Sequence, residues 1–137
     1  MDTTTRRILI VDDEETLCEV LKLNLENEGY DVDTAFSAEQ ALTYDLRSYS
    51  LVLLDIMMGE MSGLEMAEHL RLSPNSLIAS SPSSPHEASI PPIIFLTALS
   101  DEDTVLQGFK LGADDYISKP FRIAEVLARV AAVLRRT

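Results

Sequence analysis

Short apolar runs rich in β-branched residues alternate along this chain with longer stretches of helical spacing, and few folds accommodate such an alternation. The runs predict strands over residues 8–11, about 31–35, 51–54, 93–96 and 116–118. The stretches between and after them predict helices from about 17 to 28, 37 to 47, 62 to 72, 101 to 111 and 122 to 136. We therefore expect five strand-helix units.

Local signals mark where these helices begin and end. Ser37-Ala38-Glu39-Gln40 and Ser62-Gly63-Leu64-Glu65 are capping-box sequences, in which the serine and the residue three positions later satisfy backbone donors. Gly29 and Gly112 are typical helix stops. Apolar residues at helical spacing mark the buried faces of the first helix (Leu17, Val20, Leu21, Leu25) and of the last (Ile123, Val126, Leu127, Val130, Val133, Leu134).

Strands that alternate with helices imply parallel strands joined by right-handed crossovers, with helices on both faces of the sheet. The predicted fold is therefore α/β: a doubly wound, five-stranded parallel sheet of order 2-1-3-4-5, as in flavodoxin-like proteins. In this arrangement ligands bind beyond the carboxyl ends of the strands, where the winding reverses between the first and third strands. The topology thus predicts the position of a site before its chemistry is considered.

The length and charge of the chain exclude several classes of protein. With 137 residues it forms one domain, and its net charge of −12 disfavours direct binding of nucleic acid or anionic lipid. The single cysteine, Cys18, lies in a helical apolar pattern, so we expect a buried, reduced thiol. The apolar run 8–11 is too short for a signal peptide or a membrane span, which predicts a cytoplasmic protein without membrane contact.

Five polar residues stand just past the predicted strands and should meet at one edge of the sheet: Asp12, Asp13, Asp55, Thr97 and Lys119. Three carboxylates so close would repel one another unless a hard divalent cation lay among them, and Mg²⁺ prefers such oxygen ligands. The Lys119 ammonium and the Thr97 hydroxyl are suited to hold the oxygens of a transferred phosphoryl group. Taken singly, Asp13 could merely cap a helix and the others could be ordinary strand or loop residues. Their convergence favours a joint site.

Four stretches resemble the motifs of receiver domains from bacterial two-component response regulators, in the same order and across nearly the whole chain. They are Ile8-Leu9-Ile10-Val11-Asp12-Asp13-Glu14, Leu53-Leu54-Asp55-Ile56-Met57-Met58, Ile94-Phe95-Leu96-Thr97-Ala98 and Gly112-Ala113-Asp114-Asp115-Tyr116-Ile117-Ser118-Lys119-Pro120-Phe121. The resemblance implies a signalling switch in which Asp55 accepts a phosphoryl group from a phosphohistidine on a sensor histidine kinase. It does not imply an enzyme, beyond slow autophosphatase activity.

The resemblance also implies a role for each residue of the site. Asp12, Asp13, Asp55 and the backbone carbonyl of Met57 would ligate Mg²⁺, and Lys119 would pair with the phosphoryl group. The Lys119–Pro120 peptide bond would be cis. Thr97 and Tyr116 would form a switch pair: the phosphoryl group draws the Thr97 hydroxyl inward and Tyr116 rotates into the vacated space. The change would reach the face formed by the fourth helix, fifth strand and last helix.

Two segments depart from the pattern of the family. Gly59 stands where a proline is usual in the loop after Asp55, which relaxes that loop. Between the third helix and fourth strand, Ser73 to Pro92 contains seven serines and five prolines, a composition typical of a flexible surface insertion. We expect residues 1–137 to form the receiver domain with this insertion.

The output of the switch is predicted from the end of the chain. The last helix runs directly into Thr137, as in receivers that precede an effector domain, and a winged-helix DNA-binding effector of the OmpR/PhoB-like subfamily is the expected output, which implies control of transcription. The charged residues Asp115, Glu125, Arg129 and Arg136 resemble the homodimer face of that subfamily, whereas Val105 and Leu111 are apolar where charged partners are usual.

Two rival functions remain open at this point. A receiver-like adaptor would work without phosphorylation, and a phosphohydrolase would turn over small phosphate esters. Both make less use of the complete five-residue site than the phosphorylated switch does.

Overall fold

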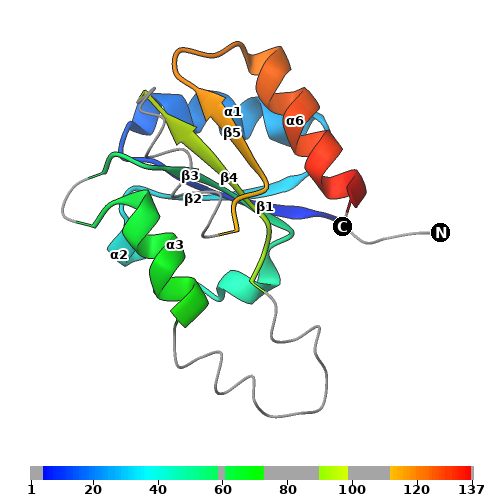
Figure 1. Cartoon of the computed structure of the whole chain (residues 1–137). Helices are drawn as coiled ribbons and strands as arrows, with labels where there is room; N and C mark the ends of the chain where they lie inside the picture. The colour runs from blue at the N-terminus through cyan, green and yellow to red at the C-terminus, as the bar shows by residue number, and fades with distance from the viewer. Residues whose placement is uncertain (1–4, 59–60, 73–89, 99–111, 137) are drawn as a thin grey trace, which may run out of the picture.

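Five parallel strands form one sheet in the order β2-β1-β3-β4-β5, in a computed structural model that describes residues 5–58, 61–72, 90–98 and 112–136 (Figure 1). The strands are β1 (Arg7–Val11), β2 (Asp31–Ala35), β3 (Leu51–Asp55), β4 (Ile93–Thr97) and β5 (Asp115–Ser118). Every neighbouring pair is parallel. The predicted fold class and strand order are confirmed.

Helices cover both faces of this sheet. The helices α1 (Glu15–Asn27) and α6 (Ile123–Arg136) lie on one face, and α2 (Ala38–Ala41) and α3 (Gly63–Leu72) lie on the other (Figure 1). All residues of β3 and β4 are buried, as a parallel strand with two covered faces requires. The apolar runs of the sequence are therefore continuous because neither face of the central strands meets water.

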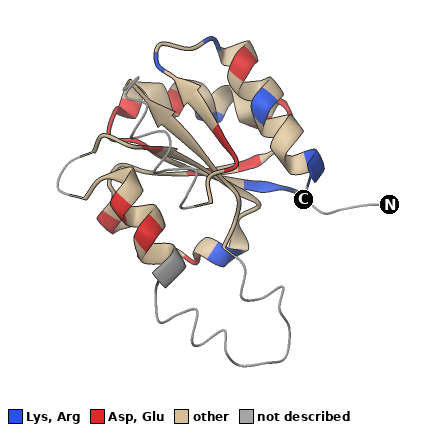
Figure 2. Ribbon diagram, in the orientation of Figure 1, with Lys and Arg blue, Asp and Glu red and all other residues tan. Residues whose placement is uncertain are grey.

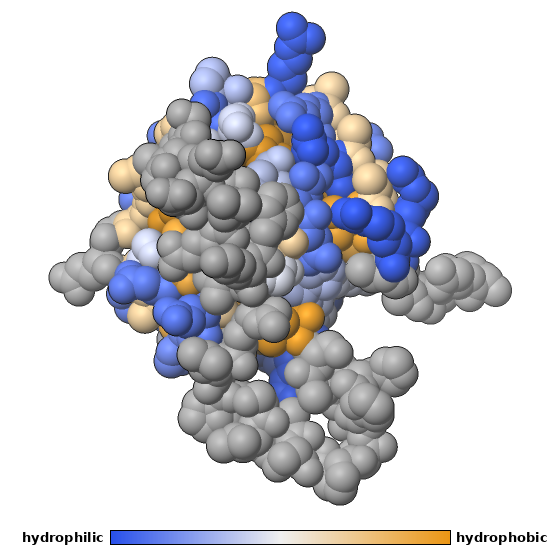
Figure 3. All heavy atoms as spheres, viewed as in Figure 1, coloured by the Kyte–Doolittle hydropathy of each residue, from blue (hydrophilic) through white to orange (hydrophobic). Residues whose placement is uncertain are grey.

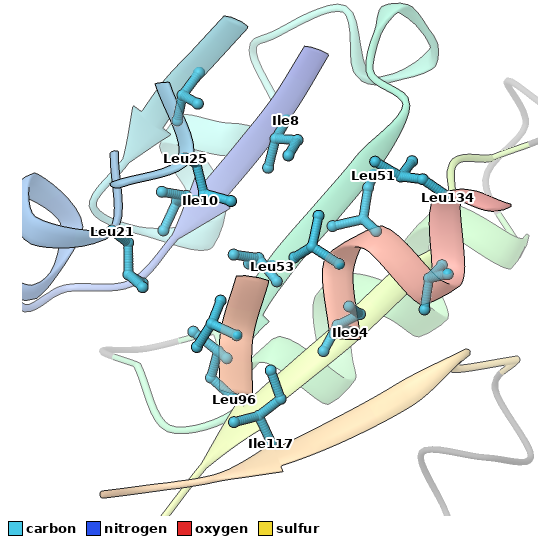
Figure 4. Packing of buried hydrophobic residues seen from close by; sticks show 14 of the residues in the cluster. Ile8, Ile10, Leu21, Leu25, Leu51, Leu53, Ile94, Leu96, Ile117 and Leu134 are labelled. Carbon is cyan, nitrogen blue, oxygen red and sulfur yellow. The ribbon is translucent and has the colours of Figure 1, made fainter. Parts of the chain in front are cut away.

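Strand geometry sorts the apolar side chains into two cores. Because successive side chains point to opposite faces, Ile8 and Ile10 join the core beneath α1 and α6, whereas Leu9 and Val11 join the core beneath α2 and α3. Figure 4 shows the first core, where Leu53, Leu96 and other strand side chains meet residues from α1 and α6. The two cores hold the carboxyl ends of the strands in a fixed relation.

The flanking helices α1 and α6 largely follow their predicted faces. In α6 the residues Val126, Val130, Val133 and Leu134 are buried. Cys18 is a buried, free thiol in α1, as expected. The prediction that Val20 lies on the buried face of α1 is wrong. Val20 is 40% exposed, because the buried face of α1 is formed by Cys18, Leu21 and Leu25. The chain leaves α1 through Gly29 at a φ of 99°, a left-handed conformation that favours glycine.

The second helix is much shorter than predicted. Instead of reaching Arg47, α2 ends at Ala41, and after a turn the chain forms the 3₁₀ helix η1 (Leu46–Ser48). The Thr43 hydroxyl donates to the Gln40 carbonyl at 2.6 Å, and the Tyr44 hydroxyl donates to the Thr34 carbonyl of β2 at 2.8 Å. These local and cross-element hydrogen bonds compete with continuation of the α-helix.

The third helix begins as the capping box predicts. The Glu65 amide donates to the Ser62 hydroxyl at 3.1 Å, and the Glu65 carboxylate accepts from the Ser62 amide at 2.9 Å. The predicted helix over 101–111, Gly59, Val105, Leu111 and all of the Ser73–Pro92 insertion up to residue 89 lie outside the described residues. Within the described residues, no helix is long and apolar enough to cross a membrane.

Candidate functional site

The polar residues predicted to converge do so at the carboxyl edge of the sheet. Asp12 directly follows β1, Asp55 is the last residue of β3, Thr97 is the last residue of β4, and Lys119 directly follows β5. The ladder continues to this edge, because the Lys119 amide donates to the Thr97 carbonyl at 2.7 Å. Parallel strands that end together thus place these side chains in one place.

Three carboxylates form a cluster at this edge. Asp12, Asp13 and Asp55 each offer an oxygen, and these three oxygens lie within 4.8 Å of one another. Asp12 and Asp55 are buried, whereas Asp13 is exposed. The donor set is all oxygen and acidic, which fits a hard divalent cation, and the exposed Asp13 side leaves the cluster open to water ligands. The cluster could therefore hold a metal ion.

Backbone donors orient the two buried carboxylates. The Glu14 amide donates to Asp12 Oδ1 at 2.9 Å, which leaves Asp12 Oδ2 directed to Lys119. The Met57 amide donates to Asp55 Oδ1 at 3.3 Å. Each of these two carboxylates thus accepts a backbone hydrogen bond from its own loop through one oxygen.

Lys119 supplies the positive charge of the site. Its Nζ lies 2.9 Å from Asp12 Oδ2 and 3.5 Å from Asp55 Oδ1, and only 18% of its side chain is exposed. Burial alone would lower the pKa of Lys119, but the hydrogen bond to Asp12 and the charges of Asp12 and Asp55 outweigh it and raise that pKa. The ammonium therefore stays charged. The Lys119–Pro120 peptide bond is cis, as the motif implied.

Asp55 is the carboxylate whose ionisation is most disfavoured among the described residues with a resolved shift. Burial, and then the negative charge of Asp12, raise its pKa to about 6, although Lys119 acts in the opposite direction. A carboxylate held in this way gains from any added cation.

Glycine at position 63 permits α3 to begin close to Asp55. A Cβ on Gly63 would lie 2.2 Å from the Asp55 carbonyl oxygen and 2.9 Å from its carbonyl carbon, closer than real side chains approach. The Gly63 amide also donates to the Ile56 carbonyl at 2.8 Å. Because the colliding atoms are backbone, a side chain here would displace the loop that carries Met57. Gly63 is thus required by close packing, which the capping-box pattern alone does not predict.

Thr97 and Tyr116 lie on neighbouring strands next to this site. Thr97 is 1% exposed at the end of β4. Tyr116 is partly buried in β5, and its ring centroid lies 5.4 Å from that of Phe95, on β4. Burial raises the pKa of Tyr116. Thr97 and Tyr116 thus lie on adjacent strands, and the Tyr116 side chain packs against the core on the α2 and α3 side of the sheet.

Two contacts at the site were not predicted from the sequence. Glu14 Oε1 accepts from Lys119 Nζ at 3.3 Å, and the Cys18 thiol donates to the Asp12 carbonyl at 3.3 Å. Glu14 belongs to the first motif, but its contact with Lys119, 105 positions away, can be found only from the fold. The thiol of Cys18 is unreactive, because burial and the charge of Asp12 raise its pKa to about 12.

Known proteins are similar to this chain in both sequence and fold. The response regulator receiver domain family matches residues 8–131. The chain belongs to this family. This receiver domain is homologous to transcriptional regulators of two-component systems, in which receiver domains are phosphorylation-based signalling switches.

Two relatives and one solved structure illustrate the similarity of this receiver domain. It is 40% identical over 133 residues to the alkaline phosphatase synthesis transcriptional regulatory protein PhoP of Bacillus subtilis, an alignment that covers 96% of this chain and 50% of PhoP. It is 40% identical over 131 residues to the response regulator ArlR of Staphylococcus saprophyticus, covering 95% and 53%. The chain spans about half the length of these relatives. The non-phosphorylated HemR receiver domain from Leptospira biflexa matches with a TM-score of 0.76 and 33% identity, covering 95% and 94%.

The raised pKa of Asp55 predicts that this carboxylate destabilises the metal-free receiver domain at neutral pH. An acid with a folded pKa of about 6 and an unfolded pKa of 3.8 loses stability as pH rises through that window, and the loss is complete above it. In EDTA, D55N should therefore raise the free energy of unfolding at pH 7.5 by about 1–3 kcal/mol. The gain should shrink toward pH 4, as measured by urea denaturation.

Asp45→Asn provides the matched control for this measurement. Asp45 is exposed and its side chain caps no helix, so D45N removes the same charge without relieving a buried carboxylate. D45N should leave stability nearly unchanged across the same pH range. Equal effects of D45N and D55N would contradict the assignment of the destabilisation to the buried site.

Proposed function

We propose that Asp55 is the residue on which this receiver domain is phosphorylated, with the phosphoryl group coming from a phosphohistidine of a sensor histidine kinase. The observation that carries the proposal is the position of Asp55: a buried carboxylate 3.5 Å from the Lys119 ammonium, inside a cluster of three acidic residues. The arrangement combines a nucleophile, a fixed cation and room for a second cation.

The chemistry is a transfer between two nucleophiles. An Asp55 oxygen attacks the phosphorus of the phosphohistidine, the P–N bond breaks, and the imidazole leaves with its electron pair and takes up a proton from solvent. The Lys119 ammonium would neutralise one phosphoryl oxygen, and the hydroxyl of Thr97, the last residue of β4, would donate to another. The mixed anhydride formed on Asp55 is the signalling state.

Mg²⁺ is the cation that this donor set fits best. Asp12, Asp13 and Asp55, with the backbone carbonyl of Met57, would hold it, and it would offset the charge of the phosphoryl oxygens. The protein's own part is to keep two of these carboxylates oriented by backbone amides. Without a cation, the ionised form of the buried Asp55 is disfavoured, so phosphorylation should need the metal.

The proposed readout runs through Thr97 and Tyr116. A phosphoryl group on Asp55 would draw the Thr97 hydroxyl toward it and vacate space into which the Tyr116 ring turns. Tyr116 is partly buried, and its ring centroid lies 5.4 Å from that of Phe95 on the neighbouring strand β4. The change would alter the face formed by β5, α6 and the expected fourth helix over 101–111, which lies outside the described residues, and partners would read the state there.

Phosphorylation by a small donor distinguishes this switch from the adaptor and the phosphohydrolase. With acetyl phosphate and Mg²⁺, intact-mass spectrometry should show one added phosphoryl group, and EDTA or D55N should abolish it. D45N serves as the matched control and should behave as wild type. No incorporation would favour the phosphorylation-independent adaptor, and continuous turnover of a small phosphate ester would favour the phosphohydrolase.

The residue beside the phosphorylation site predicts a long-lived phosphoryl group. The Met57 side chain is 57% exposed next to Asp55, and a thioether orients a hydrolytic water poorly. Leu99, two residues after Thr97 in the sequence, is also apolar but lies outside the described residues. We expect autodephosphorylation with a half-life of minutes or longer, so the domain acts at most as a slow autophosphatase.

The variant Met57→Gln, of similar length, tests this expectation. Its amide can hydrogen-bond a water near the phosphoryl group, so M57Q should shorten the half-life while the extent of initial incorporation stays the same. The measurement is loss of the added mass over time after removal of acetyl phosphate. A wild-type half-life of seconds would contradict the role given to Met57.

The α6 side of the molecule is the proposed homodimer surface. Arg129 lies 3.0 Å from Asp115 of β5 and 3.1 Å from Glu125 of α6, and 42% of the Arg129 side chain is exposed. The surface over α6 is mainly hydrophilic in the view of Figure 3, and its basic residues are seen in Figure 2. Such exposed pairs can exchange partners with a second copy at little cost. Arg136, by contrast, has no ion pair within the described residues and donates to the Asp114 carbonyl at 3.4 Å.

Phosphorylation should promote this dimer if the readout reaches β5 and α6. We expect the beryllofluoride-activated receiver to elute as a dimer in size-exclusion chromatography and the untreated receiver to elute as a monomer. R129A should weaken the activated dimer, because it removes the cation that both acidic residues contact. Identical elution with and without beryllofluoride would argue against a phosphorylation-driven dimer through this face.

We further propose that residues 1–137 form one receiver domain, with the insertion at 73–92, within a longer regulator. The support is that the relatives above are transcriptional regulators about twice as long as the matched region. A winged-helix DNA-binding effector is the proposed output.

The net charge of −12 supports the view that this segment does not itself bind nucleic acid. A buried reduced Cys18 supports a cytoplasmic location.

A further inference from the structure

One charged contact at the site has no role in the proposed phosphotransfer. Glu14 is the N-cap residue of α1, but its side chain makes no capping hydrogen bond. Instead, its Oε1 accepts from Lys119 Nζ at 3.3 Å, and 62% of the Glu14 side chain is exposed. An exposed glutamate whose side chain does not cap its own helix is thus held against the positive charge of Lys119.

Lys119 has three carboxylate neighbours that compete for its ammonium. Asp12 lies at 2.9 Å, Glu14 at 3.3 Å and Asp55 at 3.5 Å. Asp12 and Asp55 belong to the cluster that could hold a cation, whereas Glu14 does not. A cation in that cluster would weaken the hold of Asp12 and Asp55 on Lys119, because like charges repel. The Glu14 contact alone would keep its strength.

We propose that Glu14 is a positioning residue that retains Lys119 on the Asp12 side of the site and thereby slows phosphorylation of Asp55. The proposal rests on the proposed function of Asp55. Lys119 must pair with the incoming phosphoryl group in the transition state, and its contact with Glu14 then has to loosen. An interaction that stabilises the ground state more than the transition state raises the barrier.

Two opposite effects follow when this contact is removed. In Glu14→Gln the ammonium is free to follow the phosphoryl group, so the phosphorylation rate at saturating Mg²⁺ should rise about two- to fivefold, the range that one exposed ion pair can contribute. The freed Lys119 also competes more strongly with Mg²⁺ for Asp12 and Asp55. The Mg²⁺ concentration at half-maximal rate should therefore increase. A purely structural effect of the substitution would not raise the phosphorylation rate while weakening the affinity for Mg²⁺.

The experiment measures initial rates of phosphorylation by acetyl phosphate over a range of Mg²⁺ concentrations, with the complete chain. Glu14→Asp keeps the charge but draws the carboxylate back by about 1.5 Å, one C–C bond, and at an N-cap position it can turn to the helix amides instead. Glu15→Gln removes an adjacent exposed charge that has no ion pair within the described residues. We expect E14D to accelerate phosphorylation as E14Q does, and E15Q to match wild type.

The outcomes separate this inference from the function on which it rests. If the wild-type chain takes up no phosphoryl group, the proposed function of Asp55 fails. If wild type is phosphorylated but E14Q is not faster at saturating Mg²⁺, the role of Glu14 is refuted. If only E14Q accelerates, or if E15Q accelerates equally, the effect is one of overall charge on an anionic donor, and the direct contact with Lys119 is likewise refuted. Thermal unfolding followed by circular dichroism checks that all variants are folded.

Discussion

Two buried carboxylates and one ammonium at the end of a parallel sheet are the interaction on which the rest of this structure depends. Asp12 and Asp55 are almost without contact to water. Burial disfavours the charge of Asp55, and Lys119 offsets this only in part. Such a site persists only if something else supplies the stability of the fold. The two apolar cores on either side of the sheet do so, because every residue of β3 and β4 is buried.

The same packing makes the site responsive. Asp55 ends the central strand β3, with β1 on one side and β4 on the other, so each neighbouring strand delivers a functional side chain to it. In the proposed mechanism, added charge on Asp55 would act on Lys119 beyond β5 and on Thr97 at the end of β4. Because β4 and β5 are paired through four residues, a rearrangement at their ends would then be passed along this edge of the sheet. Phosphoryl binding and its readout would thus share these two strands.

Much of this arrangement could be predicted from the sequence because it depends on local patterns. The apolar runs predicted the strands within one residue, and the alternation predicted the order of the sheet. The capping box before α3 formed as expected. The α2 region was mispredicted because its end depends on hydrogen bonds from Thr43 and Tyr44, one of them to another strand. Val20 was misplaced because helical spacing alone does not say which edge of an apolar stripe faces the core.

What the sequence by itself determined is the fold and the identity of the site, because strand polarity sends the residues after each strand to one edge. Only the tertiary structure decided how the charges there are shared. Glu14 reaches Lys119, and Gly63 passes within a few ångströms of the Asp55 backbone. These contacts join residues distant in the chain at separations set by packing of side chains. No periodicity or motif encodes such distances, so they emerge only once both cores are formed.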